Sequence, residues 1–245
     1  MARLVHADQA TGIATLTLDS PANRNALSAD LVGELRAALA DAGADPTVRA
    51  VVLTHTGTTF CSGADLKSPC DPADFLALLL EVAELPKPVV GRVTGHVRAG
   101  GLGLLGACDI AAAGPRSTYA FTETHLGVVP AVISAPLLPR LDPRAASRYL
   151  LTAEAFDAAE AARIGLLTLH GADVDEVLAP VLAGLRKAGP EALAATKRLL
   201  TAPVRAALAE HGAALTALSA RHFASAEARE GITARLERRD PSWAR

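Results

Sequence analysis

The chain has 245 residues, of which 50% are hydrophobic and 3% aromatic, and its formal net charge is −2. This length favours one domain with a sizeable core, and the mixed charges argue against nucleic-acid binding and a polybasic membrane anchor. No apolar run approaches the roughly 18 residues that span a bilayer, and the opening residues lack a signal-peptide pattern. Cys61, Cys70 and Cys108 form no CxxC pair, which is typical of reduced thiols. We therefore expect a cytoplasmic protein without nucleic-acid or membrane partners.

The first half of the chain alternates between predicted strands and predicted helices. Alternating or β-rich runs predict strands at 4–6, 13–18, 48–54, 88–93, 109–113 and 119–121. Helical spacing, with Ser28 as an N-cap and Pro72 at a helix start, predicts helices over 29–42, from 72 onward and over 102–108. Because strands alternate with helices, the sequence predicts an α/β fold with parallel strands and ligand sites at the strand ends.

The second half of the chain is rich in alanine and predominantly helical. Helices are predicted at 143–150, 157–163, 174–187 and 190–200, with one or two more across 203–237. The change in composition predicts a core at 1–180 and a C-terminal helical region for oligomerisation at 181–245. In that region an apolar helix face should be left uncovered by the core and be buried between subunits; it comprises Val204, Leu208, Leu215 and Leu218.

Two glycine-rich loops follow predicted strands, at 57–65 and at 98–109. Their spacing matches neither the GxGxxG dinucleotide motif nor the GxxxxGK[ST] phosphate loop. A glycine turn at a helix start presents free N–H groups, which can hold the negative charge that develops on a carbonyl oxygen. Close helix packing, which also needs small residues, explains the glycines equally well at this point.

Taken together, five segments resemble the enoyl-CoA hydratase/isomerase family, also called the crotonase family. The similar segments are an N-terminal CoA-binding loop at 23–27, two oxyanion loops at 60–66 and 95–109, an acid/base segment at 121–130, and a C-terminal signature in two pieces at 227–232 and 237–243. The resemblance implies a crotonase-like spiral of ββα units with a C-terminal helical region. It also implies an acyl-CoA substrate, a homotrimer or homohexamer, and no metal or other cofactor, because coenzyme A is part of the substrate.

The resemblance also implies roles for individual residues. The backbone N–H groups of Ala64 and Gly100 would form an oxyanion hole, and Glu123 would be the catalytic acid and base. Substrate-binding residues would be Arg24, Ala26, Leu27, Ser62, Gly63, Asp65, Leu66 and Gly101. From its apolar neighbours, Glu123 should have a raised pKa, which suits proton transfer near neutral pH.

The chain departs from the hydratases of this family at Gly103, where they carry a first glutamate. Hydration of a 2-enoyl-CoA remains the leading prediction, because some hydratase-like relatives share the glycine. A Δ3-Δ2 enoyl-CoA isomerase, which needs only Glu123, and a non-catalytic acyl-CoA-binding homologue are the alternatives. Acyl chain length and branching are not predicted. A carboxylated acyl group held by Arg98 is a further alternative, although an ion pair within the protein is the simpler expectation for this arginine.

Other polar residues have simpler expected roles. Asp65 should cap or order its loop, and His125 should be a core histidine or one behind the substrate site, with direct contact to the substrate as the less expected alternative. Cys61 has no partner base in the sequence pattern, so we do not expect it to be a nucleophile.

Overall fold

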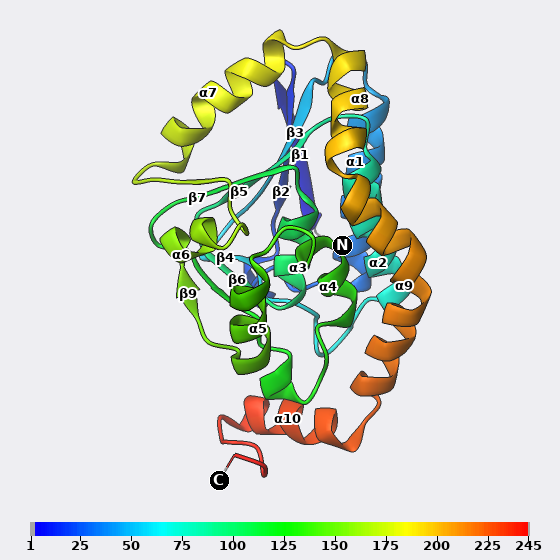
Figure 1. Cartoon of the computed structure of the whole chain (residues 1–245), viewed down its shortest axis with the longest axis vertical. Helices are drawn as coiled ribbons and strands as arrows, with labels where there is room; N and C mark the ends of the chain where they lie inside the picture. The colour runs from blue at the N-terminus through cyan, green and yellow to red at the C-terminus, as the bar shows by residue number, and fades with distance from the viewer. Residues whose placement is uncertain (1–2, 245) are drawn as a thin grey trace.

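The computed structural model describes residues 3–244, and two β-sheets form its centre (Figure 1). The larger sheet has the order β1-β2-β3-β5-β7-β10, in which only β1 and β2 are antiparallel. The smaller sheet has the order β4-β6-β8-β9, in which only β8 and β9 are antiparallel. The strands are β1 (Val5–Ala10), β2 (Ile13–Leu18), β3 (Ala50–His55), β4 (Thr59–Cys61), β5 (Val89–Val93), β6 (His96–Arg98), β7 (Ile110–Ala113), β8 (Thr118–Ala120), β9 (Phe156–Asp157) and β10 (Leu169–His170).

Strands and helices follow one another in a repeating pattern. The units β3-β4-α2, β5-β6-α3 and β7-β8-α4 each place one strand in the larger sheet and one in the smaller sheet before the helix. This arrangement confirms the predicted spiral of ββα units. The helices are α1 (Ala29–Ala44), α2 (Pro72–Glu84), α3 (Gly100–Ala107), α4 (Ala131–Leu137), α5 (Pro143–Thr152), α6 (Ala158–Arg163), α7 (Val174–Lys187), α8 (Pro190–Leu200), α9 (Ala202–Phe223) and α10 (Ala226–Glu237).

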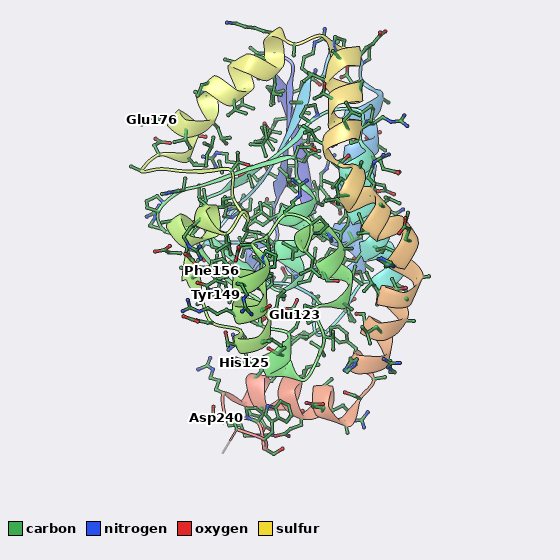
Figure 2. The ribbon with its side chains drawn as sticks, viewed as in Figure 1. Glu123, His125, Tyr149, Phe156, Glu176 and Asp240 are labelled. Carbon is green, nitrogen blue, oxygen red and sulfur yellow. The ribbon has the colours of Figure 1, made fainter. Side chains whose placement is uncertain are left out.

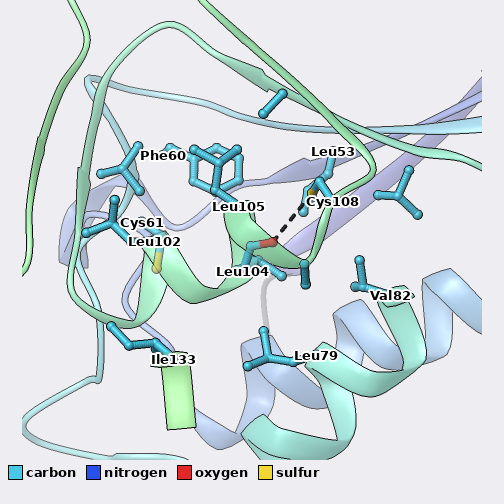
Figure 3. Close-up of a cluster of buried hydrophobic side chains, with 14 of the residues drawn as sticks. Leu53, Phe60, Cys61, Leu79, Val82, Leu102, Leu104, Leu105, Cys108 and Ile133 are labelled. Carbon is cyan, nitrogen blue, oxygen red and sulfur yellow. Dashed lines mark hydrogen bonds between the residues drawn. The ribbon is translucent and has the colours of Figure 1, made fainter. Parts of the chain in front are cut away.

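Helix α3 lies in the middle of the core (Figure 3). Its residues from Gly101 to Ala107 are all buried, because leucine and glycine leave no polar side chain on any face. Leu102 and Leu105 pack among buried side chains of the neighbouring strands and helices, including Phe60 and Leu79. Burial on all sides fixes the position of the first turn of α3, which carries the second glycine loop.

Most predicted elements are confirmed, and the differences have physical causes. Helices α7 and α8 have the predicted bounds, and Ser28 caps α1 by accepting a hydrogen bond from the N–H of Leu31. The stretch 203–237 forms two helices, because the chain breaks after α9 and Ser225 caps α10. Helix α4 was not predicted, since it has only 7 residues and includes Pro136.

The prediction that the core leaves an apolar face of the C-terminal region uncovered is wrong. Helix α9 packs against α2 and α4 of the same chain, so the core does cover that face. Val204 and Leu208 are each only 2% exposed, and Leu215 packs against the core cluster. Exposed leucines lie elsewhere, namely Leu66, Leu138, Leu151, Leu199, Leu200 and Leu236.

A buried ion pair joins the C-terminal helices to the sheet. The Lys197 Nζ on α8 lies 2.8 Å from Asp109 Oδ2 and donates to the carbonyl oxygens of Val82 and Lys87. The division at residue 180 remains a prediction, and this residue lies within α7. In the part of the chain that the structure describes, no helix is long and apolar enough to cross a membrane.

Candidate active site

The two glycine-rich loops meet at one edge of the smaller sheet. The first loop includes β4, so only its residues 62–65 follow a strand, and the second loop follows β6. These two strands are parallel neighbours and therefore end on the same side. Gly63 makes the close approach possible, since its φ is +91° and a Cβ there would lie 2.8 Å from the Cβ of Ala99 and 3.3 Å from the nitrogen of Gly100. The backbone at 63–64 and the start of α3 are thus held against each other.

Two backbone amides at this junction have no acceptor among residues 3–244. The N–H of Leu27 donates to Gly63 and the carbonyl of Leu27 accepts from Asp65, so the N–H of Ala64 between them points away from Leu27. Gly100 is the first residue of α3, where an N–H has no partner within the helix, and Ala99 provides no side-chain cap. Both Ala64 and Gly100 line the same cleft.

The turn that precedes α3 is strained. Its positive φ of 47° falls on Ala99, with ψ at −121°, rather than on one of the four nearby glycines. An L-residue in this region costs of order 1–3 kcal/mol and is kept only where its surroundings hold it. Here the N–H of Ala99 donates to Ala120, and its carbonyl accepts from Leu102. These two hydrogen bonds hold the strained turn, and the turn sets the orientation of the Gly100 N–H.

A cleft of about 1450 Å³ runs between these loops and the C-terminal helices. Nearly all the residues predicted to contact substrate line it, namely Arg24, Ala26, Leu27, Ser62, Ala64, Asp65, Leu66, Gly100 and Glu123. Gly63 and Gly101 are absent from this lining, because they lie behind it. A Cβ at Gly101 would be 2.7 Å from the Cβ of Cys61, so this glycine serves close packing.

Glu123 is the buried acid of the cleft. It lines the cleft, and His125 lies nearer to α10 than Glu123 does (Figure 2). The residue is only 7% exposed, and its Oε2 has no hydrogen-bond partner. Burial raises the pKa of Glu123 to about 7, against a smaller opposing effect of a hydrogen bond from its own backbone. The predicted rise in the pKa of this carboxyl is therefore confirmed, and both of its protonation states are accessible near neutral pH.

Helix α10 holds the segment that carries Glu123. The chain at 124–126 forms a short 3₁₀ helix, and α10 packs directly on it. Two glycines allow this contact, since a Cβ at Gly127 would lie 2.7 Å from the backbone of Glu227 and one at Gly231 would lie 2.5 Å from the backbone of Leu126. His125 is exposed at the cleft, so the expectation of a core histidine is wrong.

Asn25 is a structural residue of the site that the sequence analysis missed. It is fully buried with φ of 52°, and its Nδ2 donates to the carbonyls of Thr59 at 2.8 Å and Thr56 at 3.2 Å. Its Oδ1 accepts from the N–H of Ser20 at 2.7 Å. These bonds anchor the loop that carries Arg24, Ala26 and Leu27. The local sequence does not distinguish a loop asparagine that turns inward from one that is exposed to solvent.

We expect Asn25→Ala to lower the free energy of unfolding by about 2–3 kcal/mol, because buried backbone groups lose their partners. The KM for an acyl-CoA should also rise, because the anchored loop lines the cleft. Urea unfolding and initial-rate kinetics measure both effects. Asn23→Ala is the control: Asn23 is exposed and its side chain bonds only Asp65, so the loss of stability should stay below about 1 kcal/mol. Equal losses for the two variants would contradict this role of Asn25.

Asp65 and Cys61 have the roles expected of them. The Oδ1 of Asp65 accepts from the N–H groups of Lys67 and Ser68, which orders the loop and lowers the pKa of this carboxyl. Cys61 is buried, and burial raises the pKa of its thiol to about 12, which is far from that of a nucleophilic cysteine.

The position of the missing glutamate is closed by a side chain of α4. A Cβ at Gly103 would lie 2.5 Å from Cγ2 and 2.9 Å from Cβ of Ile133, and one at Gly106 would lie 2.8 Å from Leu137. Gly103 and Gly106 therefore allow α3 to pack closely on α4. For these two glycines, close helix packing is the explanation, and an oxyanion site is not. Of the carboxylates in the described lining of the cleft, Asp65, Glu123 and Asp240, only Glu123 is buried.

Comparison with known proteins agrees with this arrangement. A family model described as enoyl-CoA hydratase/isomerase matches residues 8–245. A Thermus thermophilus protein, provisionally named an enoyl-CoA hydratase, is 35% identical over 94% of this chain and 97% of its own. The crystal structure of an enoyl-CoA hydratase from Mycobacterium avium matches with a TM-score of 0.92, 48% identity and complete coverage of both chains. An enoyl-CoA hydratase/isomerase from Pseudoalteromonas atlantica matches with a TM-score of 0.89 and 27% identity, over 98% of this chain and 100% of its own. The chain therefore belongs to the enoyl-CoA hydratase/isomerase family.

Proposed function

We propose that the protein is an enoyl-CoA hydratase, which adds water to the double bond of a 2-enoyl-CoA. The observation that carries the proposal is the buried carboxylate of Glu123, whose Oε2 has no hydrogen-bond partner, in one cleft with the unpaired amides of Ala64 and Gly100. Family membership and the names of the relatives support the same reaction.

In this mechanism the thioester carbonyl oxygen accepts hydrogen bonds from the N–H groups of Ala64 and Gly100. The Glu123 carboxylate removes a proton from water as the water oxygen bonds to C3. The electron pair of the C2–C3 double bond then moves to the thioester oxygen as an enolate, which the amides stabilise; one such donor is worth about 3–4 kcal/mol in other enzymes. Glu123 returns its proton to C2, so water has been added and the acid is regenerated. These steps need no redox cofactor, because no electron transfer occurs, and they need no metal, because the two amides stabilise the enolate charge.

We further propose that the CoA part of the substrate binds at the loop of Arg24, Ala26 and Leu27. Arg24 is exposed at the cleft, where its guanidinium can meet a phosphate. Leu66 offers an apolar contact, as 40% of its surface is exposed. The glycine loops around this site contribute the remaining proposed substrate-binding residues, namely Ser62, Gly63, Asp65 and Gly101.

Acyl-CoA binding is tested first by thermal unfolding. A ligand at about 100-fold its Kd stabilises the folded protein by about 2.7 kcal/mol, so CoA and acyl-CoA should raise Tm. NAD and ATP are the controls and should leave Tm unchanged. Turnover of straight, branched and carboxylated enoyl-CoAs then separates an enzyme from a binding-only homologue. A Tm shift with ATP or NAD but none with acyl-CoA would contradict the proposal.

A Δ3-Δ2 enoyl-CoA isomerase is the second candidate. The observation that favours it is the closed space at Gly103, which leaves Glu123 as the single buried acid in the described lining. One group can remove a proton from C2 and return it to C4. Incubation with a 3-enoyl-CoA, with analysis of the product mass, distinguishes an isomer from a hydrated product.

We also propose a homotrimer or homohexamer, which the family resemblance implies and the exposed leucines support. Leu199 and Leu200 on α8 are 78% and 73% exposed, and Leu151 on α5 is 74% exposed. Contact between subunits would remove this apolar surface from water. Light scattering at micromolar concentration should give a trimer or hexamer mass, and a monomer mass would count against the assembly.

A cytoplasmic location remains part of the proposal. Cys61, Cys70 and Cys108 are all free thiols, as in proteins from reducing compartments.

A further inference from the structure

Arg98 is a half-buried arginine that has no carboxylate partner among residues 3–244. The expectation that it forms an ion pair within the protein is therefore wrong. Other arginines of this chain lie against carboxylates, namely Arg36, Arg92, Arg148, Arg163 and Arg239. A partly buried charge is costly unless an opposite charge compensates it, so an anion bound beside Arg98 would lower this cost.

Neutral oxygens hold the guanidinium of Arg98 in place. Its Nη1 donates to the carbonyl oxygens of Val97 at 2.9 Å and Thr118 at 2.6 Å, and its Nη2 donates to the Thr118 Oγ1 at 2.8 Å. The Thr118 Oγ1 also lies 2.8 Å from the Nδ1 of His96. These bonds use both N–H groups of Nη1 and one of Nη2. The N–H groups that remain are on Nε and Nη2, adjacent nitrogens that can bind both oxygens of a carboxylate.

The free donors belong to the same cleft as the proposed catalytic groups. Arg98, Gly100 and Glu123 all line it, and so does Arg235 on α10. Arg235 lies close enough to lower the pKa of the Arg98 guanidinium, in addition to the larger effect of burial. Arg235 makes no ion pair with any residue of the described chain. Two positive charges thus occupy one region of the cleft without an anion to balance them.

We propose that Arg98 binds a carboxylate at the far end of the acyl group, so that the substrate is an enoyl-CoA with a second, negatively charged carboxyl. This inference rests on the proposed function, because it places the acyl group between Glu123 and Arg98. Arg235 on α10 adds attraction for the same carboxylate, because it lines the same cleft and lies close to Arg98. Thr118 is a positioning residue, which keeps the free edge of the guanidinium directed to the acyl group.

The test compares two enoyl-CoA substrates of equal chain length, one ending in a carboxylate and the other in a methyl group. For the wild type, kcat/KM should favour the carboxylated substrate by at least about tenfold, since charge-assisted hydrogen bonds are gained. Arg98→Met should reduce this ratio by roughly 30-fold to 100-fold, mainly through KM. Arg98→Lys keeps the charge but loses the paired donors, so its ratio of kcat/KM values should lie between those of the wild type and Arg98→Met. Arg36→Met, which removes a paired arginine that does not line the cleft, should leave the ratio unchanged.

Other outcomes separate the sources of the anion. If Arg98 binds a CoA phosphate, Arg98→Met lowers kcat/KM equally for both substrates, and the proposal is overturned. Arg98→Lys guards against misfolding of the methionine variant, and circular dichroism checks both. If the wild type converts neither substrate, the proposed function fails, but calorimetry still tests the inference. Tighter binding of the carboxylated acyl-CoA, lost in Arg98→Met, supports the carboxylate site, and equal binding of both compounds refutes it.

Discussion

Glu123→Gln should lower the rate of turnover by at least about a hundredfold, because general acid–base catalysis is worth roughly 10²–10⁴-fold. Glutamine has nearly the shape of glutamate but cannot take a proton from water or return it to C2. Acyl-CoA affinity should survive, since the loops and the amides of Ala64 and Gly100 are unchanged. Single-turnover kinetics and calorimetry measure the two quantities. An unchanged rate would place the acid elsewhere, and His125, exposed at the same cleft, would be examined next.

The same substitution should stabilise the protein above neutral pH. The folded-state pKa of Glu123 is about 7 against 4.5 for an ordinary glutamate, so between these values the folded state binds more protons than the unfolded state. Stability of the wild type therefore falls as pH rises from about 4.5 to 7, and the loss is complete above pH 7. The shift corresponds to about 3 kcal/mol, which Glu123→Gln should recover in part at pH 8. Urea unfolding at pH 5 and pH 8 measures this difference, and parallel pH profiles for the two proteins would refute it.

Gly103→Glu should lower the free energy of unfolding by more than about 4 kcal/mol and should not raise hydration. Overpacking alone costs about 1–3 kcal/mol, and an unpaired buried carboxylate adds several more. The structure leaves no room for a glutamate side chain at this position, because Ile133 occupies the space. Thermal and urea unfolding measure the loss.

Gly184→Glu is the matched control for this variant. A Cβ there meets nothing within 4 Å, and the residue lies exposed on α7, so stability should change little. A double-mutant cycle isolates the cause: Gly103→Ala should cost at least about 1 kcal/mol less when Ile133 is replaced by alanine. An additive cycle, or a stable and faster Gly103→Glu enzyme, would contradict the packing account.

Segments with a strong period were predictable from the sequence, and short segments were not. Helices α7 and α8 have an apolar repeat and clear start signals, such as the cap Asp173 and Pro190 at the first position, so their bounds were correct. Strands β4 and β6 have 3 residues each, too few for any periodic pattern. Their pairing to one another, which brings the glycine loops together, became visible only in the structure.

The candidate site was predicted in part. Motif order placed Glu123, Ala64 and Gly100 in one site, and all three line one cleft. Glycines could not be assigned individually, since Gly100 leaves space for an exposed amide while Gly103 and Gly106 accommodate α4, and the sequence around them looks the same. The inward turn of Asn25 and the lack of a carboxylate beside Arg98 depend on contacts between distant segments, which no local pattern encodes.

The most direct test of the proposed hydration uses isotopically labelled water. The wild-type protein is incubated with a 2-enoyl-CoA in water enriched in heavy oxygen, and the acyl-CoA product is analysed by mass spectrometry. Hydration predicts a 3-hydroxyacyl-CoA with one labelled oxygen at C3, formed by the wild type and absent with Glu123→Gln. A product of unchanged mass with a shifted double bond, or unreacted substrate that nevertheless binds, would contradict the hydratase assignment.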